Sequence, residues 1–178
     1  WADELIDSSS VLSGQRNRLR VSRFESFRND KPHNELAKEL IAAADEAGTE
    51  NSGAASFVLA HASDKPRLTA KVSQAFLGHN GQCAQCHDHA SPAIASRGLT
   101  QQQFWQLAAF FQQTKVAPNG APRLIETDFV GLSGDASEAE LYYQTLGDER
   151  KIAYPVFLDG TAINPDGRID IVDRRAEL

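Results

Sequence analysis

A chain of 178 residues is long enough for one domain with its own hydrophobic core. Its formal charge of -6 at pH 7 argues against a general nucleic-acid binder, because phosphate contacts need lysine and arginine over a broad face. No apolar run approaches the roughly 18 residues that a membrane-spanning helix needs, so we expect no direct membrane insertion. The chain opens at Trp1 and contains no methionine, and we expect one domain over residues 1–178, excised from a longer protein.

Arginine is concentrated in one N-terminal stretch, which contains Arg16, Arg18, Arg20, Arg23 and Arg28. A run of like charge is typical of a solvated face, and this is the interpretation that we favour. Pairing of these arginines with an acidic partner is the alternative.

Two amphipathic helices are predicted before residue 80. Pro32 marks the start of the first, over 33–46, whose apolar residues recur on one face before Gly48. The second begins near Asp64 and ends at Gly78. Its apolar face carries three residues at four-residue intervals, namely Leu68, Val72 and Phe76.

Two further helices are predicted in the second half of the chain. The better defined one covers 100–114, where Thr100 and Gln103 form a capping box and an aromatic run that includes Trp105 follows. The other covers 137–147, since a serine and a glutamate three residues later precede it and a glycine ends it.

Short strands are predicted near the C-terminus, over 124–130 and over 154–158, the latter followed by an Asp-Gly turn. The segments 51–55 and 116–122 are predicted loops because of their glycine, proline and asparagine content. The sequence therefore favours a mostly α fold, a single helical domain with a few short strands near its C-terminus.

The chain has only two cysteines, and they lie in the segment Cys83-Ala84-Gln85-Cys86-His87. A random arrangement of two cysteines and five histidines would give this pattern roughly once in 3,000 chains. The spacing is that of haem attachment, because each thiol adds to one vinyl group of the same porphyrin and the next imidazole then lies under the iron. The sequence predicts one covalently attached haem c, held by Cys83 and Cys86, with His87 as the proximal iron ligand.

Three other interpretations of the cysteine pair remain open. A structural zinc site could use Cys83, Cys86 and His89, although no second cluster of cysteine or histidine follows at the usual spacing. A thioredoxin-like redox pair would need a strand before the motif, where the pattern predicts a helix. A plain disulfide is the third alternative.

The second axial ligand of the iron is less constrained than the first. Without methionine, His/Met ligation cannot come from these residues, so the iron is bis-His, five-coordinate with an open face, or ligated from outside. We favour His61 as this ligand, with His79 and His89 as alternatives, and His89 is also expected as a neighbouring contact of the haem. Phe76 and Trp105 are expected to line the porphyrin, and its propionates are a further candidate partner of the N-terminal arginines.

The stretch from Leu68 to Lys115 resembles the planctomycete-type cytochrome c domain of large exported proteins. The resemblance is carried by three segments, 76–78, 83–89 and 107–111. Further segments lie in family order, namely 28–32, 57–61, 155–160 and 173–175 together with Leu36. The resemblance implies a monohaem, cytochrome c-like domain with a redox role, and histidine at the positions of His61 and His89.

The chain departs from this family beside the motif. Relatives continue after the position of His89 with proline, phenylalanine and aspartate, whereas this chain has the segment 90–98. His79 stands where relatives have an aliphatic residue. The family's iron ligation therefore does not transfer directly to this chain.

These inferences predict a c-type cytochrome domain that transfers single electrons. Its expected partners are a redox protein or further domains of the same polypeptide, and its expected location is periplasmic or otherwise extracytoplasmic, where haem is attached to apoprotein. The competing hypothesis is a peroxidase-like haem enzyme, or a gas or redox sensor, with an open distal face.

Overall fold

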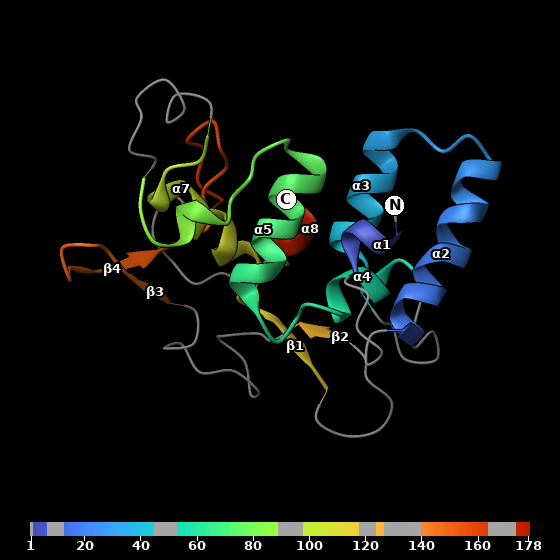
Figure 1. The fold of residues 1–178 in the computed structure, drawn as a ribbon, viewed down its shortest axis with the longest axis horizontal. Helices are drawn as coiled ribbons and strands as arrows, with labels where there is room; N and C mark the ends of the chain where they lie inside the picture. The colour runs from blue at the N-terminus through green and yellow to red at the C-terminus, as the bar shows by residue number, and fades with distance from the viewer. Residues whose placement is uncertain are drawn as a thin grey trace.

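The computed structural model is mostly helical, as predicted, with two small antiparallel sheets (Figure 1). It describes residues 2–6, 13–44, 53–88, 98–117, 124–126, 140–163 and 174–178. The α-helices are α1 (Ala2–Leu5), α2 (Ser13–Arg28), α3 (His33–Ala42), α4 (Ala55–Leu59), α5 (Lys65–Phe76), α7 (Gln101–Ala108) and α8 (Arg174–Glu177). The 3₁₀ helices are η2 (Cys83–Gln85) and η3 (Ala109–Phe111).

The arginine-rich stretch forms helix α2, and its arginines are divided between the two sides of the helix. Arg23 is only 2% exposed and donates to Glu39 of α3 over 3.3 Å. Arg20 and Arg28 are exposed. The interpretation as a solvated face is therefore wrong for Arg23, because a carboxylate on the next helix compensates the cost of burying its charge.

The main hydrophobic core lies between α1, α3, α4 and α5. Helix α4 is buried along its whole length, and all of its residues except one serine are apolar. Phe57 is fully buried, and burial of a side chain of this size contributes about 1.5–3 kcal/mol. Ala55, predicted to lie in a loop, is the first residue of this helix. We call this core the first cluster; its buried members run from Ala2 to Leu124, and the partly buried Leu178 packs against it.

The helix starts that were predicted from capping residues are confirmed. Asp64 accepts a hydrogen bond from the backbone N–H of Arg67 over 3.0 Å at the start of α5, and Thr100 and Gln103 form the capping box of α7. Gly78 has a φ of 71°, a left-handed conformation that suits glycine and follows the end of α5. Helix α7 ends earlier than predicted, because the chain tightens into η3 and then enters a strand at Thr114.

The first sheet pairs β1 (Thr114–Val116) with β2 (Leu124–Glu126) in antiparallel register. This agrees with the predicted strand over 124–130 for its first three residues, and residues 127–130 lie outside the described part. Val116, predicted to begin a loop, is the last residue of β1.

The second sheet pairs β3 (Leu141–Gln144) with β4 (Arg150–Ala153). The predicted helix over 137–147 is therefore wrong where it is described, because Tyr142 pairs with Ile152 across the hairpin and aromatic and branched residues favour strands. The predicted strand over 154–158 is also wrong. Within this segment only Val156 forms a β-bridge, and the bridge is isolated. The observed strand is β4, which ends at Ala153, just before the predicted one.

Helix α3 is shorter than the predicted 33–46, and a residue from the far end of the chain explains its end. The fully buried Arg175 of α8 donates to the carbonyl oxygens of Ile41 over 2.9 Å and of Ala43 over 2.5 Å. The same guanidinium contacts Glu126 of β2 at 2.5 Å. It therefore satisfies carbonyls that the helix end leaves without intrahelical partners.

Lys65 lies next to this buried ion pair. Its ammonium group donates to the carbonyl oxygens of Ala62, over 2.8 Å, and of Thr114. Burial lowers the pKa of Lys65 to about 8, and the positive charge of Arg175 acts in the same direction, whereas Glu126 opposes both.

We predict that this lysine makes the fold more stable as the pH rises above 8. Folded Lys65 loses its proton near pH 8 and unfolded Lys65 near 10.5, so unfolding binds a proton between these values and higher pH favours the folded state. Urea unfolding should show a gain of roughly 1–3 kcal/mol across this window. Lys65→Met should remove the gain, and an equal gain in this variant would contradict the assignment.

Candidate functional site

The cysteine motif forms the short 3₁₀ helix η2 and the two residues after it. Cys86 donates its backbone N–H to the carbonyl oxygen of Cys83 over 3.3 Å, which closes the turn. Residues three apart in a 3₁₀ turn are eclipsed, so Cys83 and Cys86 lie on the same side. Both are exposed free thiols. Two sulfur atoms are thus presented together to whatever approaches this side of the turn.

The imidazole of His87 is oriented by its own neighbour. Its Nδ1 lies 2.7 Å from the carbonyl oxygen of Asp88, and since a carbonyl can only accept, Nδ1 carries the proton. The lone pair then belongs to Nε2 of an exposed side chain. This is the tautomer in which a histidine binds a metal through Nε2.

A buried amide holds the turn from behind. Gln101, the first residue of α7, is 7% exposed, and its Nε2 donates to the carbonyl oxygens of Gln85 over 3.2 Å and of Cys86 over 2.9 Å. The indole N–H of Trp105 donates to the same Gln85 oxygen over 3.0 Å. Asp88 in turn accepts from the backbone N–H of Gln101 over 2.6 Å. These bonds fix the backbone on both sides of Cys86.

Apolar packing fixes the inner side of the turn. Ala84 belongs to a second hydrophobic cluster, whose buried members are Ala70, Ala84, Leu99, Phe104 and Leu107. Gly81 lies so close to α7 that an added Cβ would be 3.1 Å from the Phe104 ring. The turn is therefore seated on α7 and α5 by side chains that do not include the thiols or the imidazole.

Helix α7 also connects the turn to the second sheet. The Nε2 of Gln101 is also 2.9 Å from the carbonyl oxygen of Gln144 in β3. Trp105 stacks on Tyr143 of the same strand, with ring centroids 5.6 Å apart and planes inclined by 11°. The hairpin β3–β4 thus contacts Gln101 and Trp105, the two residues that hold the turn in place.

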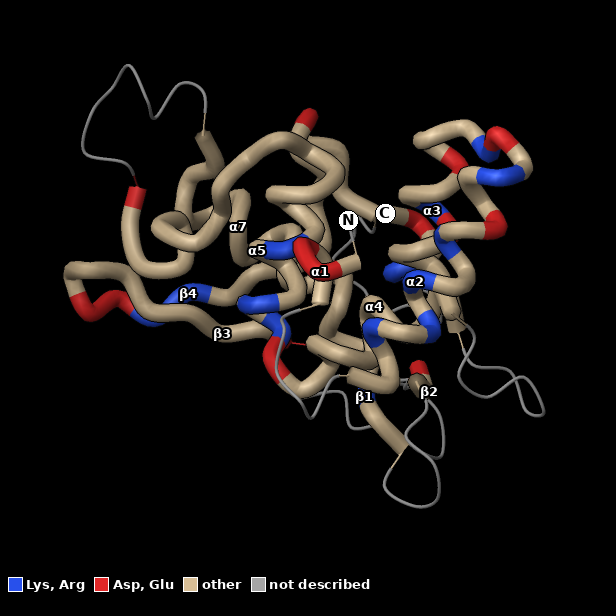
Figure 2. The backbone as a smooth tube through the Cα atoms, turned by 45° about the vertical axis from the view of Figure 1, so that its right-hand side comes forward, with Lys and Arg blue, Asp and Glu red and all other residues tan. Residues whose placement is uncertain are grey.

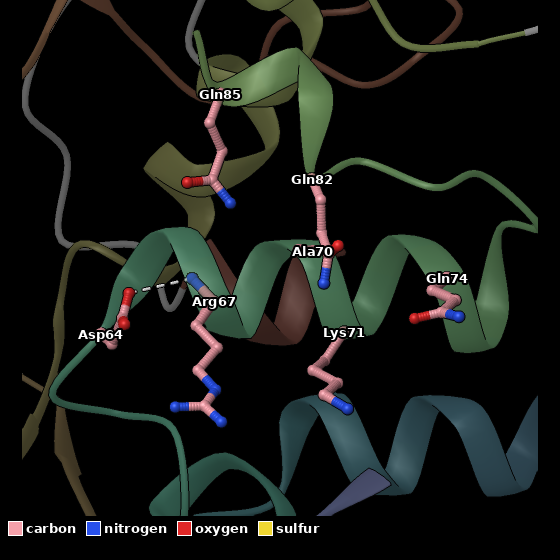
Figure 3. Close-up of a pocket in the computed structure, with 7 residues that line it drawn as sticks. All are labelled: Asp64, Arg67, Ala70, Lys71, Gln74, Gln82 and Gln85. Carbon is pink, nitrogen blue, oxygen red and sulfur yellow. Dashed lines mark hydrogen bonds between the residues drawn. The ribbon is translucent and has the colours of Figure 1, made fainter. Parts of the chain in front are cut away.

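A polar cleft of about 320 Å³ lies between α5 and η2 (Figure 3). Gln82 and Gln85 extend from the turn toward α5, while Arg67 and Lys71 extend from α5 away from them. The two glutamines are one 3₁₀ turn apart, so the thiols lie on an adjacent side of the same turn. The lining also includes Asp64, Ala70 and Gln74.

The structure brings together some of the site residues predicted from the sequence but not all of them. Cys83, Cys86 and His87 lie on one turn, and Trp105 contacts that turn. The position of His89 lies outside the described residues.

His61 and Phe76 belong to the first cluster instead, where both contact the ring of Phe57 with centroids 5.9 Å and 6.0 Å away. His61 is 2% exposed, and its Nε2 is 2.8 Å from the carbonyl oxygen of Leu5. In this arrangement Nε2 donates to the carbonyl, so Nε2 carries the proton and offers no lone pair to a metal. His79 is partly exposed and its backbone bonds to Ser73 of α5.

Within the described ranges, no three His, Cys, Asp or Glu side chains gather closely enough to hold a metal ion. The zinc alternative is not tested by this observation, because its third ligand, His89, lies outside the described residues. No described helix is both long enough and apolar enough to span a membrane.

The sequence analysis missed Gln101, Asp88 and Tyr143. The position of Gln101 follows the capping residue Thr100, yet three consecutive glutamines begin this helix and nothing local distinguishes them. The one available signal is geometric, because of these three glutamines only the first donates to the turn.

Comparison with known families gives one match. Residues 13–116, more than half of the chain, match PSCyt2, which is described as a protein of unknown function (DUF1549). The chain belongs to this family. The PSCyt2 match begins with the first residue of α2 and ends with the last of β1, so it includes η2 and α7. No curated protein and no solved structure matches the chain.

We predict that Gln101→Leu lowers the free energy of unfolding by about 1–3 kcal/mol, because it removes the side-chain donor to the Cys86 carbonyl oxygen and one of the two donors to the Gln85 oxygen. Gln102→Leu, on the exposed side of the same helix, is the matched control and should change it by less than about 0.5 kcal/mol. Urea unfolding of both variants is the measurement. Equal stability of the two would show that the amide does not brace the turn.

Proposed function

We propose that the chain attaches one haem c through thioether bonds to Cys83 and Cys86, with His87 as the proximal iron ligand. The single observation that carries this proposal is the geometry of the turn. Two eclipsed, exposed thiols are followed by an imidazole whose Nδ1 already donates to a carbonyl, which leaves Nε2 for iron. Both thiols are exposed, so a porphyrin that approaches from solvent can reach them.

The residues behind the turn have a defined part in this proposal. Gln101 and Trp105 hold the carbonyl groups of Gln85 and Cys86, and so keep the two sulfur atoms and the imidazole in their relative positions. A bound haem would supply a one-electron iron couple, whose potential depends on axial ligands, hydrogen bonds and burial. Rigid ligands limit the structural change that accompanies electron transfer.

We propose single-electron transfer as the function, by a domain of the planctomycete cytochrome c type. The resemblance of residues 68–115 supports this proposal, while the PSCyt2 family to which the chain belongs has no described function. The partner would be a redox protein or a further domain of the same polypeptide. The location would be outside the cytoplasm, because haem is attached to apoprotein there.

The position of His61 supports a second candidate function. His61, expected from the sequence as the distal ligand, would have to break its bond to Leu5 and leave the first cluster to reach iron. Unless this histidine, His79 or His89 binds iron, the distal face is open. An open face suits a peroxidase-like enzyme or a gas or redox sensor.

The first test of the proposal is attachment. Expressed with haem-maturation machinery, the protein should have an intact mass of 19.4 kDa plus one haem, and the colour should stay with the chain in acidified organic solvent. The double variant Cys83→Ser, Cys86→Ser should be colourless. A wild-type protein that has the mass of the bare chain, or that releases its pigment, contradicts the proposal and favours a disulfide or a metal clip.

The second test separates the two candidate functions. Low-spin visible bands that are unchanged by carbon monoxide are expected for electron transfer, whereas a high-spin ferric spectrum that shifts with carbon monoxide indicates the enzyme or sensor. If His61 is the distal ligand, His61→Ala should convert the spectrum to high spin. His79→Ala and His89→Ala are matched variants, and the one that alters the spectrum identifies the ligand.

A further inference from the structure

Helix α2 is strongly basic in an acidic chain. Its 16 residues include five arginines and one glutamate, a net charge of +4, whereas the whole chain has a formal charge of -6. Figure 2 shows basic residues along α2, and in Figure 1 this helix forms one outer edge of the described structure. Such local asymmetry gives one face of the molecule a positive potential.

Some of these arginines form ion pairs within the protein. Arg16 contacts Asp3 of α1 at 3.4 Å, and Arg23 is buried against Glu39. Arg20 and Arg28 are exposed on the side of the helix that faces away from the core. They are the charges that α2 presents to a partner.

Large apolar side chains occupy the same outward side. Val21, Phe24 and Phe27 are 60%, 64% and 54% exposed, and their spacing of three places them next to one another. Arg20 and Arg28 lie four residues before and after Phe24, so they flank it along the helix. We call these five residues the outer face of α2. A contiguous exposed patch of this kind marks an interaction site more often than a single exposed residue does.

We propose that the outer face of α2 docks on the surface of an anionic lipid bilayer. A basic helix that exposes phenylalanine is the pattern of helices that lie in the membrane interface. The rings of Phe24 and Phe27 would enter the boundary between headgroups and acyl chains, and the guanidinium groups of Arg20 and Arg28 would contact lipid phosphates at the same depth. The helix lies on the surface in this arrangement.

A second copy of the chain fits the outer face less well. If two α2 helices paired antiparallel about Phe24, Arg20 of one copy would lie at the height of Arg28 of the other. Like charges would then surround the apolar contact, and such a juxtaposition opposes association. Glu25 lies 3.8 Å from Arg28, but both side chains are more than half exposed, so this pair compensates little of the charge.

The shape of the outer face favours a broad, flat partner. A straight helix at the edge of the molecule can place all five residues of the face on a plane, and a bilayer surface offers that plane together with phosphate groups. A protein partner would need an apolar hollow with carboxylates on both sides of Phe24. If the test shows no lipid binding, such a protein becomes the expected partner.

The test is flotation of the full chain with phosphatidylglycerol vesicles and, separately, with phosphatidylcholine vesicles. We expect binding to phosphatidylglycerol that weakens as salt is added, and much weaker binding to phosphatidylcholine. Phe24→Ser with Phe27→Ser should lower the affinity about tenfold. Arg20→Gln with Arg28→Gln should lower it roughly fivefold for each arginine removed.

Matched controls lie on the hairpin β3–β4. Leu146→Ser removes a side chain that is 77% exposed, and Lys151→Gln removes an exposed charge; neither should alter binding. Circular dichroism establishes that each variant is folded. Absence of binding to phosphatidylglycerol overturns the proposal and leaves the outer face for a protein, and equal binding to both lipids, or equal loss in the controls, overturns it too. Haem is not needed, so this result is independent of the haem proposal.

Discussion

One buried amide connects the parts of the candidate site. The side chain of Gln101 lies within hydrogen-bonding distance of carbonyl oxygens from Gln85, Cys86 and Gln144, and so joins the cysteine turn to a strand more than 50 residues further along the chain. Gln101 is only 7% exposed, and a buried amide without hydrogen-bond partners would be costly, so the turn, α7 and the hairpin share one arrangement. The exposed thiols are therefore presented by a backbone that is set independently of them. Preorganisation of this kind lowers the entropy that binding has to overcome.

The elements predicted correctly from the sequence are those with strong local signals. The capping residues at Asp64 and Thr100 and the apolar periodicity of α5 identify helices whose stability comes from neighbours in sequence. Errors occur where distant residues decide. The segment 141–144 has weak helical signals but pairs with 150–153, and a pairing of this kind is invisible in a window of single-sequence periodicity. Helix α2 was missed as a helix because its buried side contains arginine rather than an apolar stripe.

The relative positions of the motif residues could be predicted because they depend on spacing, whereas the residues that support the turn could not. The positions of Cys83, Cys86 and His87 relative to one another follow from a short turn, which five consecutive residues encode. The bracing by Gln101 and Trp105 depends on how α7 packs, and the choice of His61 as distal ligand depended on chain reach alone. A sufficiently long connection allows His61 to reach the iron but does not favour that position over others. Burial of His61 beside Phe57 shows which of the permitted positions the packing selects.

The guanidinium of Arg175 has a consequence for how the chain acquires its structure. It contacts residues that precede it by 134 and 132 positions, and it also contacts Glu126. During synthesis α3 and α5 emerge long before this arginine, so the carbonyls of Ile41 and Ala43 and the charge of Glu126 must stay hydrated until α8 arrives. Contacts with this separation close slowly, because a long loop has to be ordered first. Burial of these polar groups therefore waits for α8.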